Sequence, residues 1–220
     1  MEDKYEHIRP VIDSLPDSLT EQERQLAIDV VKKNTDVFSK SKFDLGRTTL
    51  VQHRIDVGSN RPFKEPLRRH PKAYLDAIDN EVEAMLKSDV IEKSDSPWAS
   101  NVVLVMKKGE KDADGNEKQS IRFCNDYRRL NSMTYKDSFP IPRVDSTLEL
   151  LAGNRVFCTL DLQSSFWQCP IHPSDKDKIA FITRQGLFQY KVLSFGLVNA
   201  APLFQRLMHL VLTGVLWRTS

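Results

Sequence analysis

The chain has 220 residues, of which 40% are hydrophobic and 28% charged, and its formal net charge is +2. This length and composition indicate a globular protein with a buried core, and so small a net charge does not by itself indicate a nucleic-acid binder. The charge is uneven, because residues 1–56 hold nine Lys or Arg against eleven Asp or Glu and the remainder holds twenty-three against nineteen. The basic excess therefore lies in the larger, C-terminal part.

The cysteines and histidines suggest neither disulfides nor a zinc site. Cys124, Cys158 and Cys169 form no Cys-x-x-Cys pair, which favours a reducing compartment, and the five histidines lack metal-ligand spacing. The longest wholly apolar run, 102–106, is too short to span a bilayer, and the first residues do not resemble a signal peptide. We therefore expect an intracellular, cytoplasmic protein with no membrane partner.

The first 87 residues predict two helices joined by a connector. The first helix spans 20–38 and begins with a Thr-x-x-Glu capping box. Residues 39–70 show no sustained period and predict an extended connector, with at most a short strand at 51–57. Apolar residues at helical spacing predict the second helix over 71–87, with Pro71 in its first turn.

The middle of the chain predicts a hairpin, a helix and a strand. Apolar runs at 102–106 and 121–124 flank a polar stretch with an Asp-Gly turn, which indicates a long β-hairpin. An amphipathic helix is expected over 143–151, and alternating apolar residues predict a strand over 156–162.

The last part predicts a second hairpin and a final helix. The hairpin strands are 179–183 and 187–192, and Asn199 is placed to begin the helix. Helices and hairpins that alternate in this way indicate an α+β fold.

Asp161 is the first candidate for chemistry, because it stands near the end of the expected strand 156–162. Alternation puts it on the face opposite Leu160 and Leu162, where a cation would reach it. A lone Asp after a strand is most often a turn former or a helix cap, so this position alone is weak evidence.

Five ordered sequence blocks make a stronger case together. They are Ser-Pro-Trp-Ala-Ser at 96–100, Asp-Tyr-Arg-Arg-Leu-Asn at 126–131, Phe-Pro-Ile-Pro-Arg at 139–143, Leu-Asp-Leu at 160–162 and Phe-Gly-Leu at 195–197. In this order they resemble the reverse transcriptase of gypsy-type long-terminal-repeat retrotransposons. The family's Tyr-x-Asp-Asp motif, which supplies further catalytic carboxylates, does not occur in these 220 residues.

The resemblance implies an α+β polymerase of the right-hand fold. It implies fingers and a truncated palm over 60–220, lacking the Tyr-x-Asp-Asp hairpin, the thumb and the connection. Residues 1–59 would be an N-terminal helix and a linker, similar to the segment that precedes the polymerase in a Pol polyprotein.

The resemblance also implies a metal site. Asp161 matches the family's first metal-binding aspartate, with the backbone carbonyl of Leu162 as a further ligand for Mg²⁺ or Mn²⁺. Since two-metal transfer needs several carboxylates, we expect no tight metal binding to this chain alone.

Other residues match the family's nucleotide-binding positions. Arg122 matches an arginine that binds the incoming triphosphate, although a strand arginine is usually just a solvated surface residue. Either Lys107 or Lys108 would be its partner lysine, and which of the two aligns is open.

Three further positions match residues around the new base pair. Phe166 matches the aromatic residue that packs under the sugar and excludes a 2′-hydroxyl, although core packing is the commoner role of such a Phe. Phe195 and Gly196 match the loop beside the nascent base pair.

Three more residues, Asp126, Arg128 and Gln205, are expected to brace the fingers or to contact the template. The chain also departs from the family pattern at three positions, Asn101, Asn125 and Ser165, and each change is to a small polar residue. These departures affect fine geometry and remove no expected ligand.

The implied function is RNA-directed DNA polymerization, a templated nucleotidyl transfer. Its partners would be an RNA or DNA template-primer, dNTPs and the remainder of a Pol polyprotein, within a virus-like particle in an intact element. We expect this chain to be inactive alone. The alternatives are a non-enzymatic, transposon-derived remnant that binds nucleic acid or another polypeptide, and a fragment without selected function.

Overall fold

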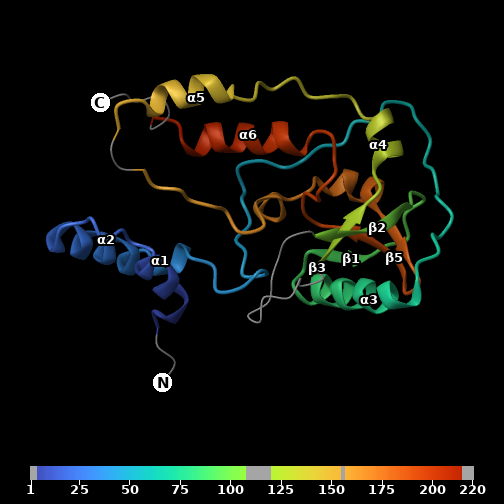
Figure 1. The fold of residues 1–220 in the computed structure, drawn as a ribbon. Helices are drawn as coiled ribbons and strands as arrows, with labels where there is room; N and C mark the ends of the chain where they lie inside the picture. The colour runs from blue at the N-terminus through green and yellow to red at the C-terminus, as the bar shows by residue number, and fades with distance from the viewer. Residues whose placement is uncertain (1–3, 108–119, 155–156, 215–220) are drawn as a thin grey trace. The chain divides into compact units, whose positions relative to one another are not determined.

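The computed structural model describes residues 4–107, 120–154 and 157–214 (Figure 1). The chain divides into two compact units. The first comprises Met1–Gly46 together with Asp161–Ser164, and the second comprises Arg47–Leu160 and Ser165–Ser220.

The first unit is helical. Its elements are η1 (Glu6–Ile8), α1 (Arg9–Asp13), α2 (Glu21–Lys33) and η2 (Thr35–Val37). The expected capping box is confirmed, because Thr20 Oγ1 accepts a hydrogen bond from the Glu23 backbone N–H and the Glu23 carboxylate accepts one from the Thr20 N–H. The α-helix ends at Lys33, before the expected end at residue 38.

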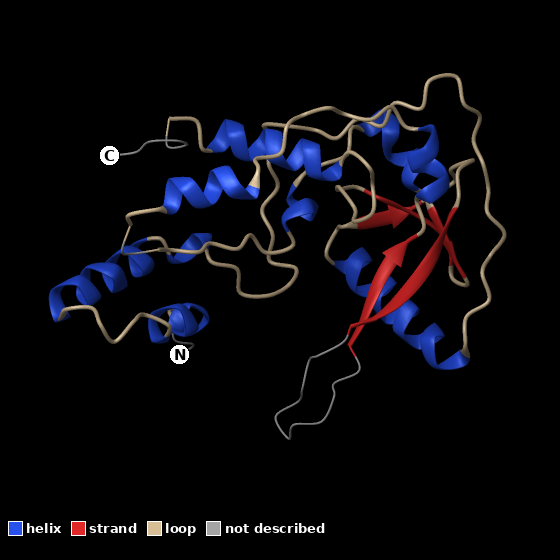
Figure 2. Cartoon of the chain, turned by 45° about the horizontal axis from the view of Figure 1, so that its top comes forward, coloured by secondary structure: helices blue, strands red, loops and turns tan. Residues whose placement is uncertain are grey.

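The second unit is built on one five-stranded sheet with the order β1-β5-β4-β2-β3 (Figure 2). The strands are β1 (Ile91–Lys93), β2 (Ser100–Lys107), β3 (Ser120–Asn125), β4 (Phe181–Thr183) and β5 (Gly186–Tyr190). Both expected hairpins are confirmed, since β2 pairs antiparallel with β3 and β4 pairs antiparallel with β5. The Asp-Gly turn of the first hairpin lies outside the described residues.

The expected helix over 71–87 is confirmed as α3 (Lys72–Lys87), which runs along one face of the sheet in both views (Figures 1 and 2). Pro71 is its N-cap and not part of its first turn. The side chains of Ile78, Val82 and Met85 are buried, and each contributes about 1.5–3 kcal/mol of transfer free energy relative to exposure. On the sheet, Phe181 is fully buried among other aromatic residues.

Short helices complete the second unit: α4 (Arg128–Met133), α5 (Val144–Leu151), η3 (Ser165–Gln168), η4 (Pro173–Ile179) and α6 (Ala200–Val211). The structure confirms the helices expected over 143–151 and from Asn199 onward. The Asn199 side chain does not cap α6, however. It bonds to the backbone of Tyr135 and Asp137 and thereby joins the start of α6 to the chain after α4.

The strand expected over 156–162 is wrong for the described part of that segment. Residues 157–162 have no strand pairing, and the side chains of Phe157 and Leu160 are 61% and 82% exposed. Alternating apolar residues form a strand only where a neighbouring strand supplies hydrogen-bond partners, and no described strand lies alongside this segment.

Residues 51–57, where at most a short strand was expected within the connector, form no strand. A single parallel bridge pairs His53 with Ile171, and the side chains of Ile55 and Val57 are buried. The backbone groups of this segment form hydrogen bonds with other loops, as His53 does with Pro170 and His172, and not with a strand ladder.

Candidate active site

The expected metal ligands Asp161 and Leu162 lie in the first unit, in the segment Asp161–Ser164. Both residues are exposed, and the segment forms no helix or strand. Ser164 has a φ of 43°, a left-handed conformation that is uncommon outside glycine.

Arg122 lies in the second unit, on the open face of the β2–β3 hairpin. Phe123 packs edge-on against the buried Phe181, with ring centroids 5.8 Å apart, so alternate residues of β3 face away from that core. Arg122 is one of these and is exposed. Its cross-strand neighbour Val105, on the same face, is 48% exposed.

The positive charge of Arg122 affects the Cys124 thiol, which lies on the same face of the hairpin. Burial raises the pKa of the Cys124 thiol, and the positive charge of Arg122 opposes that rise. No carboxylate in the described ranges of the chain forms an ion pair with Arg122.

Of the two candidate partner lysines, one lies among the described residues. Lys107 is the last residue of β2 and pairs with Ser120 in the strand ladder. Lys108 lies outside the described residues.

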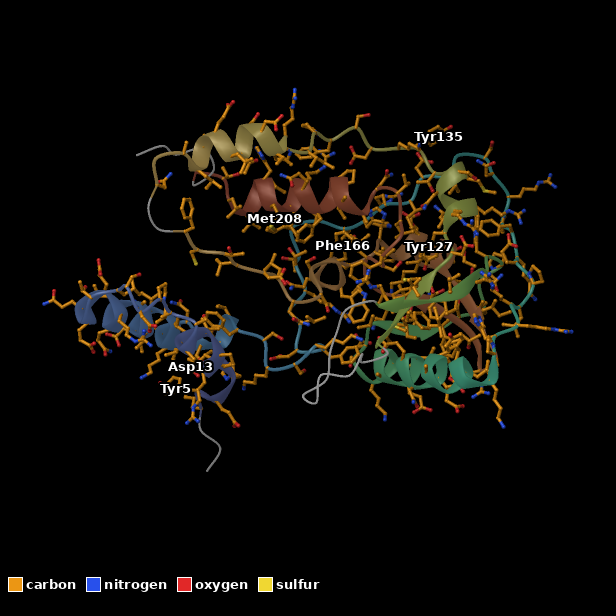
Figure 3. The ribbon with its side chains drawn as sticks, in the orientation of Figure 1. Tyr5, Asp13, Tyr127, Tyr135, Phe166 and Met208 are labelled. Carbon is orange, nitrogen blue, oxygen red and sulfur yellow. The ribbon has the colours of Figure 1, made fainter. Side chains whose placement is uncertain are left out.

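Phe166 is part of a cluster of three aromatic rings in the second unit. It lies in η3 beside α6 (Figure 3), with its ring centroid 5.2 Å from that of Phe195 and 5.7 Å from that of Phe204. Phe166 is half-buried and Phe195 is 51% exposed. The structure therefore brings together two of the expected nucleotide residues and leaves an aromatic surface open to solvent.

Gly196 follows Phe195 in a conformation that favours glycine. Its φ is 89°, and a Cβ atom there would meet the Asn125 backbone oxygen at 3.5 Å and Tyr127 at 3.7 Å. The loop thus lies in van der Waals contact with Asn125 at the end of β3 and with Tyr127.

Asp126 and Arg128 pair with each other. The Arg128 Nε and Nη2 atoms donate to the two Asp126 carboxylate oxygens at 2.8 and 2.6 Å, and these hydrogen bonds hold the pKa of Asp126 below its usual value. Both residues line a polar hollow of about 330 Å³, together with Glu65, Asn101 and Arg129.

Three further residues singled out in the sequence are Asn101, Asn125 and Gln205. Asn101 holds the backbone of Pro66 and Arg68 with its amide group. Asn125 is buried, and its Nδ2 donates to the Tyr127 hydroxyl. Gln205 is half-buried on α6.

Comparison with known proteins decides the family. A sequence model described as reverse transcriptase (RNA-dependent DNA polymerase) matches residues 105–218. The chain belongs to this family. The expectation drawn from the five sequence blocks is confirmed.

The relatives of this reverse transcriptase chain include transposon polyproteins. It is 35% identical over 171 residues to the retrovirus-related Pol polyprotein from transposon 297 of Drosophila melanogaster, covering 77% of this chain and 16% of that protein. It is 32% identical over 198 residues to the Pol polyprotein from transposon gypsy of the same organism, covering 90% of this chain and 18% of that protein. The chain therefore spans less than a fifth of these curated relatives.

Solved structures show the same fold. The prototype foamy virus protease-reverse transcriptase superposes with a TM-score of 0.78 at 20% identity, covering 94% of this chain and 26% of that one. A foamy viral protease-reverse transcriptase in complex with an RNA/DNA hybrid gives a TM-score of 0.76 at 19% identity, covering 96% of this chain and 27% of that one. The expected α+β reverse transcriptase fold is confirmed.

Reverse transcriptases generally use divalent metal ions. Across the described ranges of this chain, no three or more His, Cys, Asp or Glu side chains gather in a way that would hold such an ion. Asp161 on its own does not supply the several carboxylates that a two-metal site needs. No helix among the described residues is long and apolar enough to cross a membrane.

Two buried polar residues of the second unit were not predicted from the sequence. The Asp175 carboxylate accepts hydrogen bonds from Lys178 Nζ at 2.6 Å, Arg54 Nε at 2.8 Å and the Ile55 backbone N–H at 3.1 Å. His53 is 2% exposed, and burial lowers its pKa to about 4. Lys178 is close to Asp175 in sequence, but the other partners of Asp175 and the backbone partners of His53 are more than 100 positions away along the chain. No local pattern therefore predicts that these two residues are buried.

Proposed function

We propose that this chain supplies the nucleotide-facing part of an RNA-directed DNA polymerase, which extends a primer on an RNA or DNA template. Membership of the reverse transcriptase family is the observation that carries the proposal. The relatives are named as Pol polyproteins of transposons, which supports a retrotransposon Pol polyprotein as the whole protein. The proposal places that protein in the cytoplasm, within a virus-like particle in an intact element.

The roles proposed for the individual residues come from their match to the family's motifs, and their chemistry is compatible with those roles. The exposed guanidinium of Arg122 binds triphosphate oxygens in pairs, because its planar N–H groups match two oxygens at once. Lys107 or Lys108 adds a second positive charge. The half-buried ring of Phe166 packs under the sugar, and Phe195 and Gly196 contact the nascent base pair.

Asp161, with the Leu162 backbone carbonyl, is proposed to hold one of the two Mg²⁺ or Mn²⁺ ions in the whole polymerase. That ion would stabilise charge on the reacting phosphate. Asp126, Arg128 and Gln205 are proposed to brace the fingers or to contact the template. The division into a linker over 1–59 and a polymerase part over 60–220 also stays a proposal.

Photocrosslinking tests the nucleotide role. The 220-residue chain is mixed with a primed template and a high concentration of a dNTP that carries a photoreactive azide on its base, and labelled peptides are mapped by mass spectrometry. We expect label near Phe166 and Phe195, suppressed by excess of the complementary unmodified dNTP. Arg122→Ala should reduce the labelling several-fold, since it removes charged hydrogen bonds to the triphosphate.

The control variant is Arg61→Ala, which removes an exposed arginine outside the hairpin and should leave the labelling unchanged. Template binding without any competed dNTP label would favour the non-enzymatic remnant. Label that maps away from Phe166 and Phe195 would contradict the proposed nucleotide site.

A further inference from the structure

The loop that carries Phe195 and Gly196 is held by one side chain of α4. Asn131 Nδ2 donates to the Gly196 carbonyl oxygen at 2.7 Å, and Asn131 Oδ1 accepts from the Val198 backbone N–H at 2.9 Å. A single amide group therefore bonds to the backbone on both sides of Leu197.

Asn131 is itself fixed in place. Its backbone N–H donates to the Tyr127 carbonyl oxygen at 2.7 Å, and the Tyr127 side chain also lies 3.7 Å from the position of a Cβ atom on Gly196. The Tyr127 hydroxyl in turn donates to the Ile179 carbonyl oxygen at 3.0 Å. The loop is thus connected to the buried Ile179 of η4 through the segment that contains Tyr127 and Asn131.

Packing of α4 does not need Asn131. Leu130 is fully buried and anchors the helix, whereas Asn131 is only half-buried. The hydrogen bonds of the Asn131 side chain are made to the loop, whereas its backbone N–H bonds within the α4 region.

We propose that Asn131 is a positioning residue, which fixes the loop of Phe195 and Gly196 against the end of β3. The inference rests on the proposed function, in which that loop contacts the nascent base pair. An amide is required, because its oxygen accepts and its nitrogen donates. An ionised aspartate of the same shape accepts only, and glutamine reaches one methylene further.

NMR of the 220-residue chain tests this proposal through two signals. The first is the hydrogen exchange rate of the Val198 amide, and the second is the carbonyl carbon shift of Gly196. In Asn131→Ala both bonds are lost, so Val198 should exchange roughly tenfold faster, the size expected for one hydrogen bond, and the Gly196 shift should move. In Asn131→Asp at neutral pH, Val198 should keep most of its protection while the Gly196 shift still moves.

Ser132→Ala is the matched control, because it changes the next residue on α4, whose hydroxyl donates to the Arg129 carbonyl within the helix. It should leave both signals as in the wild type. The isosteric Asn131→Asp variant keeps the test available if Asn131→Ala does not fold.

Two results would overturn the inference. In the first, the Val198 exchange rate and the Gly196 carbonyl shift are the same in both Asn131 variants as in the wild type. The other is an equal rise of exchange across β2, β3 and α3, which would mean that Asn131 serves general stability. The two signals need neither nucleotide nor metal, so a failure here is distinguishable from a failure of the proposed polymerase function.

Discussion

Arg122 has its candidate role because of the face of the β2–β3 hairpin on which it lies. Its neighbour Phe123 packs against Phe181, and this fixes the side toward which Arg122 projects. The alternation of apolar residues in the sequence predicts that arrangement, because a hairpin strand exposes every second residue. The sequence could not predict that no carboxylate among the described residues pairs with Arg122, because ion pairs depend on residues that are far apart along the chain.

Arg122→Ala is expected to impair nucleotide use more than template binding. In a polymerase that joins this chain to the Tyr-x-Asp-Asp segment of a gypsy-type relative, KM for dNTP should rise about tenfold or more, the loss expected for charged hydrogen bonds. Steady-state primer extension measures KM, and Arg61→Ala is the control. Unchanged KM and kcat with abolished template binding would show that the triphosphate assignment is wrong.

His53 should make the stability of the second unit depend on pH. Burial lowers its pKa from 6.5 to about 4, so the folded chain resists protonation more than the unfolded chain does. Stability should therefore fall as the pH drops from about 6.5 toward about 4, by roughly 1–3 kcal/mol from this residue.

Urea denaturation at several pH values measures that dependence. His53→Gln should flatten the fall between these pH values, and His209→Gln, which changes an exposed histidine on α6, should not. An identical pH profile for His53→Gln and the wild type would contradict this explanation.

At the scale of elements, sequence patterns predict those helices whose stabilising contacts lie within a few residues. The capping box at Thr20 and the apolar stripe of α3 were readable from the sequence, because their partners lie within a few residues. The strand expected over 156–162 failed because a strand needs a neighbour, which no local pattern supplies. Asn131 was missed for a similar reason, since its partners on the loop are more than 60 residues away.

The backbone conformation of Gly196 should make the loop intolerant of a side chain at this position. Its φ of 89° is unfavourable for residues with a Cβ atom, so Gly196→Ala should cost about 1–2 kcal/mol of unfolding free energy. Gly46→Ala is the control, because Gly46 has no positive φ and open space around it. Equal unfolding free energies for the two variants, measured in urea, would contradict the strained loop.

At the scale of the whole molecule, the second unit exposes a set of large apolar side chains. The set comprises residues of α5 and of the following segment: Val144, Leu148, Leu151, Phe157 and Leu160, whose exposed fractions lie between 45% and 82%. Exposed apolar surface favours association, so the 220-residue chain should self-associate as its concentration rises.

Sedimentation velocity measures this association. Leu148→Lys should shift the chain toward monomer, whereas Leu67→Lys, which changes an exposed leucine that lies beside α3, should have less effect. A wild-type chain that stays monomeric at all concentrations and unfolds in one cooperative transition would count against this expectation.

The family of the chain followed from five blocks spread over its length, and fold and relatives confirm it. The completeness of the metal site is a different matter, because only Asp161 among the expected carboxylates is present and it lies in a segment without regular structure. We therefore propose that activity depends on carboxylates that these 220 residues do not contribute.

Primer extension with Mg²⁺ or Mn²⁺ tests this central claim most directly. The 220-residue chain alone should extend no primer, and the chain joined to the Tyr-x-Asp-Asp segment of a relative should incorporate dNTPs in a template-dependent way that Asp161→Asn abolishes. Extension by the 220-residue chain alone that Asp161→Asn removes, or a joined polymerase that is indifferent to Asp161→Asn, would contradict it.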